Sequence, residues 1–231
     1  LAAAQALRSG LDKAGVVLRT DTDLLTGVWA ERPALPRGAV YAHRAPQAAV
    51  TRAAKLASVR EAMARHGATQ HFVSTVDDVA WITNLRGADV DYNPVFLAHL
   101  LIDAAKATLF VSAGKIDAAL TKALAADGIA LADYADAAKA LASLPSGATL
   151  LVDPKRITLA FREQVPAAVK VVEAINPSTH AKSRKTAEEA AHITKTLGPR
   201  HEHPVAHRGA GACPSLRHTA HRFVARHQRV A

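Results

Sequence analysis

The loop ITNLRGADVDYNPVF, residues 82–96, carries the side chains best suited to binding chemistry in this chain. Its ten central positions hold six residues that can donate or accept hydrogen bonds: Asn84, Arg86, Asp89, Asp91, Tyr92 and Asn93. Arginine has five donors in a planar fork, which suits a carboxylate or several carbonyl oxygens at once. Polar loops between apolar elements often carry function, so this loop is the candidate functional site.

A purely structural interpretation of this loop is also open. Asn and Asp cap helices and form turns, so their presence here requires no ligand. On this interpretation the whole role of Arg86 is an ion pair with Asp89, and the whole role of Pro94 is to start a strand. The spacing of the residues does not decide between the two interpretations.

The elements on both sides of the loop predict an α/β fold with a mixed sheet flanked by helices. A helix is expected over 48–66, ended by Gly67 in a left-handed conformation, and a strand over 70–76. Asp77 and Asp78 then occupy positions typical of helix N-caps. The remaining expectations are a hairpin formed by VFLAHLLID and ATLFVS, helices over 114–128, 136–144 and 156–164, and strands over 129–134, 149–153 and 169–175.

The first 47 residues have less of the pattern of a domain. A helix is expected over 1–15 and a strand over 16–20, which together are too little for an independent core. Residues 1–28 are therefore interpreted as the remnant of a preceding domain. Three prolines exclude a regular helix from residues 29–47, which are interpreted as a linker to a main domain over 48–177.

The last 38 residues differ in composition from the rest of the chain. Residues 194–231 hold seven Lys or Arg against Glu202 alone, a net charge of +6 out of the +9 of the whole chain. They also hold six of the twelve histidines and show no hydrophobic periodicity. A high-GC gene read in a shifted frame gives such a bias, so residues 194–231 are interpreted as an aberrant, frameshifted and disordered basic tail.

Several other kinds of site are disfavoured by spacing. The tail motifs His201-x-His203 and His218-x-x-His221 lack the regular spacing of a structural zinc site, so no metal site is predicted. His71 and His99 fall in expected strands and are interpreted as core histidines rather than ligands. No G-x-S-x-G motif and no glycine-rich phosphate loop is present.

Charge and hydropathy also limit the expected partners. The excess positive charge lies in a tail with Phe223 as its only aromatic residue, so no nucleic-acid partner is expected. No apolar run is long enough to cross a bilayer, so no membrane partner is expected either. A single cysteine excludes an internal disulfide and fits a cytoplasmic location.

Three separated motifs resemble Xaa-Pro aminopeptidases of the longer aminopeptidase P type, in the creatinase and prolidase group of the M24 metallopeptidases. DDVAWITNLRGADVDYNPVF resembles a segment in the N-terminal half of these enzymes, and DLLTGVWAERPALP resembles the linker between their first two domains. AKSRKTAEEAAHI resembles the helix that leads into their catalytic domain. On this resemblance, 1–28 and 48–177 belong to the first and second creatinase-like N-terminal domains, and 178–193 is the linker helix towards the catalytic domain.

The resemblance also implies a function. Enzymes of this group remove an N-terminal residue that precedes proline, using two divalent metals, commonly manganese, in a C-terminal domain. This chain is expected to be the truncated, non-catalytic N-terminal part, inactive and without a cofactor of its own. Proline-containing peptides would bind only to the full-length parent enzyme. In that enzyme, Arg86, Asp89 and Asn93 of the loop are expected to lie near the domain interface, where they hold the loop or contact peptide.

Assembly and alternatives complete the sequence-based predictions. The resemblance implies a homodimer formed through the N-terminal domains. Two other functions remain open at this point. One is a non-enzymatic α/β domain for dimerisation or interaction, and the other, less favoured, is a basic nucleic-acid-binding module.

Overall fold

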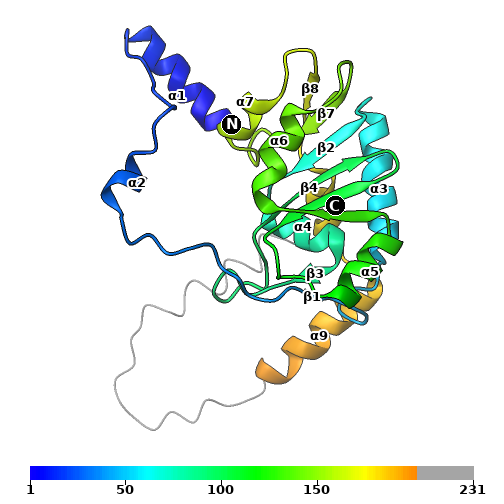
Figure 1. Cartoon of the computed structure of the whole chain (residues 1–231). Helices are drawn as coiled ribbons and strands as arrows, with labels where there is room; N and C mark the ends of the chain where they lie inside the picture. The colour runs from blue at the N-terminus through cyan, green and yellow to red at the C-terminus, as the bar shows by residue number, and fades with distance from the viewer. Residues whose placement is uncertain (202–231) are drawn as a thin grey trace. The chain divides into compact units, whose positions relative to one another are not determined.

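A six-stranded mixed sheet lies within residues 1–192, which group together as one unit. The computed structural model describes residues 1–201 (Figure 1). Strand β4 is antiparallel to β2 and β5, whereas the pairs β5–β6, β2–β7 and β7–β8 are parallel. The α/β fold with a mixed sheet is therefore confirmed. In spatial order the strands are β6 (Ile129–Ala132), β5 (Ala107–Val111), β4 (Ala98–Asp103), β2 (Gln70–Val73), β7 (Thr149–Val152) and β8 (Lys170–Glu173).

Helices cover both faces of the sheet because its strands are apolar on both sides. Neighbouring residues of one strand enter different cores: Val73 packs in one buried cluster and Phe72 in the other. The first cluster also takes side chains from α3 (Arg52–Arg65), α4 (Val76–Thr83) and α5 (Ala118–Ala126). The second takes them from α6 (Ala137–Ala142) and α7 (Leu159–Gln164). Each fully buried Leu or Phe in these clusters contributes about 1.5–3 kcal/mol.

The ends of several elements follow the local sequence signals. Thr51 caps α3 by accepting a hydrogen bond from a backbone N–H at 3.2 Å, and Gly67 beyond its end has φ +61°. The predicted hairpin is confirmed as β4 and β5. Helix α9 (Ala187–His201) begins behind a capping box in which Thr186 and Glu189 each bond the other's backbone N–H, at 3.2 and 3.1 Å.

Three expectations near the loop and the N-terminus are wrong. The strand predicted over 70–76 ends at Val73, because α4 begins at Val76 and Thr75 takes its N-cap position. Asp78 is therefore not a cap but a carboxylate in the first turn, only 2% exposed. Residues 16–20 form no strand, and Val17 there is 82% exposed.

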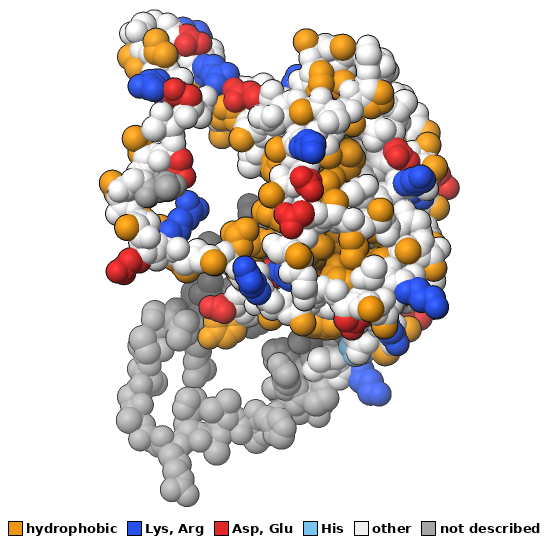
Figure 2. Space-filling view, in the orientation of Figure 1, with side chains coloured by type: hydrophobic (Ala, Val, Ile, Leu, Met, Phe, Trp, Pro, Cys, Tyr) orange, Lys and Arg blue, Asp and Glu red, His pale blue; other side chains and the backbone are white. Residues whose placement is uncertain are grey.

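The segment before α3 contains two helices and one short strand, and the rest of it is irregular. It contains α1 (Ala2–Lys13), α2 (Leu24–Val28) and β1 (Tyr41–Ala42), which pairs antiparallel with β3 (Leu85–Arg86) in a separate two-stranded sheet. Apolar side chains are exposed along residues 16–35, among them Leu24 and Val28, at 75% and 81% (Figure 2).

The remaining described elements are a 3-10 helix (Tyr134–Asp136) and α8 (Pro177–Ser183), which precedes α9. The interpretation of residues 194–231 as a frameshifted tail falls largely on positions 202–231. Those positions, which include His203, His218 and His221, lie outside the described residues.

Candidate functional site

Arg86 holds the start of the polar loop against the end of α4. It lies on β3 opposite Tyr41 of β1, and its Nη1 donates to the carbonyl oxygens of Ala80 at 3.0 Å and Leu85 at 2.8 Å. The guanidinium thus binds two carbonyl groups rather than Asp89, the partner that the structural interpretation of the sequence had considered. Burial lowers the pKa of Arg86, although Tyr41 opposes the shift.

Asp89 holds the middle of the loop through a fully buried ion pair. Its Oδ2 pairs with the Nζ of Lys115 and accepts a hydrogen bond from the backbone N–H of Leu97 at 2.7 Å. The side chains of Asp89 and Lys115 are 0% and 1% exposed. The carbonyl of Lys115 also accepts from the N–H of Val40 at 2.8 Å. One ion pair therefore joins the loop, the turn before α5 and the chain ahead of β1.

The tip of the loop is presented to solvent. Tyr92 has φ +60°, an unusual conformation for a bulky residue, and its side chain is fully exposed. Asn93 is exposed, and its backbone bonds Val90 and Val95 at 3.2 and 2.7 Å. Within the described residues, the Asn93 side chain makes no hydrogen bond. The three candidate residues thus divide into two that hold the loop and one that it displays.

Close packing fixes the base of the loop as well. A Cβ on Gly87 would lie 2.7 Å from the Cβ of Phe96, whose side chain is fully buried. Such a contact is shorter than real carbon atoms tolerate, so only glycine fits at this position. The loop is therefore held by an arginine, an ion pair and a close backbone approach.

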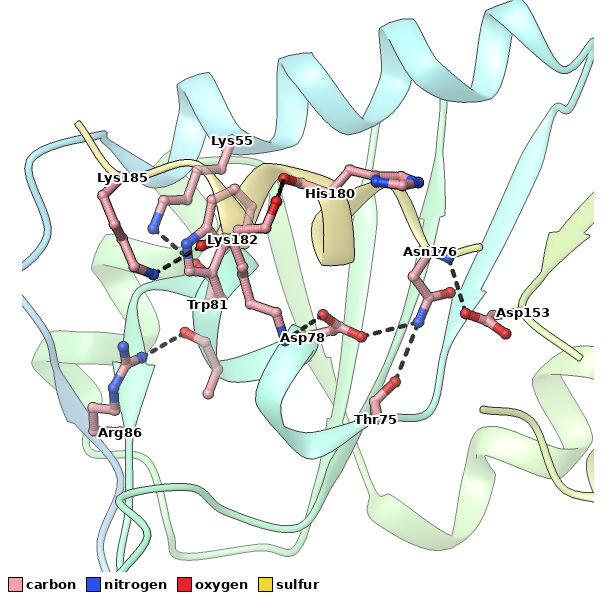
Figure 3. A network of polar contacts seen from close by, with 12 residues as sticks. Lys55, Thr75, Asp78, Trp81, Arg86, Asp153, Asn176, His180, Lys182 and Lys185 are labelled. Atoms are coloured by element: carbon pink, nitrogen blue, oxygen red, sulfur yellow. Dashed lines mark hydrogen bonds and ion pairs between the residues drawn. The ribbon is translucent and has the colours of Figure 1, made fainter. Parts of the chain in front are cut away.

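The C-terminal end of α4 gathers further cations that the sequence did not reveal (Figure 3). Lys55 donates to Trp81 O at 3.0 Å and to Asn84 Oδ1 at 2.6 Å, with its Nζ 4.2 Å from the centre of the Trp81 ring. Arg52 bonds Thr83 O at 2.5 Å. Cations at the carbonyl end of a helix complement its dipole. Burial lowers the pKa of Lys55 to about 8, with Glu189 opposing the shift and Arg86 adding to it.

A second polar network anchors α8 (Figure 3). Lys182 pairs with Asp78 Oδ1 at 2.7 Å, and Asn176 donates through Nδ2 to Asp78 Oδ2 at 3.0 Å. The backbone N–H of Asn176 donates to Asp153 Oδ2 at 3.1 Å. Burial would raise the pKa of Asp78, but Lys182 and Asn176 outweigh it and lower that pKa. We call Asp78, Asp153, Asn176 and Lys182 the α8 anchor.

The roles of Asn84 and Lys115 were not predicted from the sequence, although the position of Asn84 carries a signal for its role. It ends α4 with φ +50°, and Asn directly after a helix is a common left-handed cap. Lys115 left none, because it lies 26 residues from Asp89 in a short turn. Its role follows from the tertiary fold alone.

The described residues offer limited chemistry of their own. Nowhere among residues 1–201 do three or more His, Cys, Asp or Glu side chains come together in a way that could hold a metal ion. His71 is fully buried with Nδ1 3.0 Å from Leu151 O, and His99 Nδ1 lies 3.2 Å from Ser74 Oγ. Both therefore serve the core rather than a site. None of the helices in this part of the chain has the length and apolar character needed to span a membrane.

Comparisons with known proteins agree with this architecture. Aminopeptidase P2 of Arabidopsis thaliana is 32% identical over 143 residues, which are 61% of this chain and 20% of that protein. A probable Xaa-Pro aminopeptidase P of Arthroderma gypseum is 31% identical over 187 residues, which are 76% of this chain and 29% of that protein. The chain thus spans between a fifth and three-tenths of the length of these relatives.

A solved structure shows the same fold. The X-prolyl aminopeptidase of Caenorhabditis elegans, described as a cytosolic enzyme with a di-nuclear active site, superposes with a TM-score of 0.74 at 19% identity. The match covers 84% of this chain and 32% of that protein. The creatinase/prolidase N-terminal domain family matches residues 31–189, a span that holds the loop, the whole six-stranded sheet and the α8 anchor. This chain belongs to the creatinase/prolidase N-terminal domain family.

Proposed function

We propose that this chain serves as the non-catalytic N-terminal part of a metal-dependent Xaa-Pro aminopeptidase. The whole enzyme would remove an N-terminal residue that precedes proline. Family membership supports this proposal, as do relatives named as Xaa-Pro aminopeptidases that match this chain over only a fifth to three-tenths of their length. A family domain of this size is therefore one portion of a larger catalytic assembly.

The construction of the loop over residues 84–94 is the observation that carries the proposal. Arg86 holds the loop through hydrogen bonds to backbone carbonyl groups, and Asp89 holds it through an ion pair and a backbone hydrogen bond. Tyr92 and Asn93 are exposed at its tip. Fixing a loop costs conformational entropy, and a fixed tip with exposed polar groups suits contact with a neighbouring surface. We propose that this neighbour is the peptide or the catalytic domain that binds it.

The metal ions would be held elsewhere in the whole enzyme. Two bridged divalent ions need several carboxylate oxygens close together, so that a shared water becomes a nucleophile. The described residues provide no such group: Asp78 and Asp89 each pair with a lysine, and the buried carboxylate of Asp153 accepts from the backbone N–H groups of Lys155 and Asn176. We propose manganese as the ion of the whole enzyme, on the basis of the family resemblance.

Assembly and location follow by analogy with relatives. We propose a homodimer formed through N-terminal domains and a cytoplasmic location. The description of the Caenorhabditis elegans relative as cytosolic supports the location. Sedimentation velocity over a range of concentrations tests the dimer, with a concentration-independent monomer as the contradicting result.

The activity of the purified chain tests the proposal. We expect no release of the first residue from an Xaa-Pro-Pro peptide when manganese, zinc or cobalt is added. The Arabidopsis relative, assayed in parallel, provides the positive control. Metal-dependent turnover that co-purifies with this chain and disappears with a chelator would show that the chain is catalytic by itself.

A further inference from the structure

A groove of about 420 Å³ lies between α3 and α8, on the side of α8 away from Asp78. Its walls come from the two helices and from residues 174–175, which follow β8, and the side chain of His180 extends along α3 (Figure 3). Its apolar lining consists of Ala62, Ala174, Ile175, Pro177 and Ala181. Its polar lining consists of Ser58, Arg65, His66, His180 and Arg184.

All four titratable side chains of this groove are basic. Arg65 ends α3 and His66 directly follows it, whereas His180 lies on α8 and Arg184 directly follows that helix. Their side chains are exposed, and within the described residues none forms a hydrogen bond or an ion pair. In the part of the chain that the structure describes, no Asp or Glu lines the groove. The groove therefore holds positive charge that the surrounding structure does not neutralise.

Lys182 shows that this arrangement is not general for α8. Lys182, on α8, pairs with the buried carboxylate of Asp78, whereas His180 and Arg184 have no acidic partner among residues 1–201. Complementing the helix dipole accounts for a cation at each helix end. It does not account for basic side chains from two separate segments lining one groove together with apolar residues.

We propose that this groove binds a phosphomonoester of a small organic molecule. Two arginines are matched best by a dianion, and a phosphate ester carries about −1.5 to −2 charges where a carboxylate carries one. The planar arginine fork suits phosphate oxygens, and the apolar lining residues, among them the exposed Ile175, suit the organic part of the ester. The volume lies within the range of small-molecule sites, about 300–1,000 Å³.

Calorimetric titration of the full chain with phenyl phosphate tests this site. We expect saturable binding of one molecule per chain, tighter than that of inorganic phosphate or benzoate. The double variant Arg65→Gln/Arg184→Gln should weaken binding by at least about tenfold, because it removes two charge-assisted contacts. Both side chains are exposed and unpaired, so the thermal unfolding temperature should not change.

A matched control separates the groove from general electrostatics. Arg44→Gln/Arg156→Gln removes the same charge at two exposed positions outside the groove and should leave the affinity unchanged. Phosphate held by the basic residues 194–231 would be equally insensitive to both double variants. Absence of saturable binding, benzoate binding as tight as phenyl phosphate, or equal affinities of the two double variants would each overturn the proposal.

Discussion

Asp89 and Asp78 are both buried carboxylates paired with a lysine, but their lysines lie in different surroundings. Lys115, the partner of Asp89, is 1% exposed, whereas Lys182, the partner of Asp78, is 27% exposed. Water can therefore partly solvate the ammonium group of Lys182 but not that of Lys115. The difference indicates that the polar loop is locked into the domain, while the α8 anchor can loosen locally. A locked loop is what presentation of Tyr92 and Asn93 requires.

Removing the lysine of the locked pair should have the largest effect. In Lys115→Met the Asp89 carboxylate stays buried without a counter-charge, so we expect a loss of about 3–5 kcal/mol in the free energy of unfolding. Urea denaturation measures this loss. Lys122→Met, at an exposed position on α5, is the control and should change stability by less than about 0.5 kcal/mol. A loss for Lys115→Met as small as that of the control would remove the basis of the comparison.

Lowering the pH should reduce the stability of the domain by protonating His71, whose charge interacts with Asp78 and Asp153 of the α8 anchor. Burial lowers the pKa of His71 to about 4, with Leu151 O, Asp78 and Asp153 opposing the shift. The unfolded chain, with an ordinary histidine pKa of about 6.5, binds the proton more readily. The stability from neutral His71 is therefore complete above pH 6.5 and is lost as the pH falls towards 4, by about 3 kcal/mol in total.

Chemical denaturation at a series of pH values measures this dependence. The variant His71→Gln should flatten the slope of stability between pH 6.5 and 4, leaving the part due to His99, whose pKa burial also lowers to about 4. His66→Gln, at an exposed position, is the control. Identical slopes for both variants would contradict the assignment to His71.

The glycine at the base of the loop tests whether packing adds to the lock. Gly87→Ala places a methyl group 2.7 Å from the Cβ of Phe96, so we expect a loss of about 1–3 kcal/mol in unfolding free energy. Gly38→Ala provides the matched control, because its nearest neighbour would be 3.6 Å away at Asp89 Oδ1. If both variants are equally stable, the close approach of Gly87 to Phe96 does not constrain the loop.

The smallest effect is expected at the α8 anchor itself. Lys182→Met removes a partner whose charge is already partly solvated, at 27% exposure, and leaves Asp78 its hydrogen bond from Asn176, so we expect a loss of only about 1 kcal/mol. Hydrogen exchange should speed up over residues 176–184 and stay unchanged over 84–97. Faster exchange over both segments would mean that the loop and the anchor form one cooperative unit rather than two.

Local sequence patterns predicted much of the fold, but they did not predict contacts between residues far apart in the chain. The hairpin of β4 and β5 and the end of α3 at Gly67 depend on residues close in sequence, so the sequence predicted both. Asp78 was misread as a cap because two Asp residues before a helix are typical of caps. Its partner Lys182 lies about a hundred positions further along the chain, where no local pattern connects the two.

The candidate site was located by the sequence but not resolved into roles. The density of polar residues in the loop indicated its importance, yet gave Arg86, Asp89 and Asn93 the same standing. The structure separates them because only burial and partners distinguish a residue that holds a loop from one that it displays. The pairing of Asp89 with Lys115 in particular arises from the sheet, which brings the turn before α5 beside the loop.

The central claim is that this domain displays its loop to the peptide side of an Xaa-Pro aminopeptidase. A chimera in which residues 1–193 replace the matching part of the Arthroderma gypseum relative allows kcat/KM for an Xaa-Pro-Pro peptide to be measured with manganese. We predict turnover by the chimera and a roughly tenfold lower kcat/KM for Asn93→Ala, as expected for one lost hydrogen bond to substrate or catalytic domain. The exposed control Gln47→Ala should change neither kinetics nor stability. Unchanged kcat/KM for Asn93→Ala, or no turnover by a chimera that folds and binds manganese, would contradict the claim.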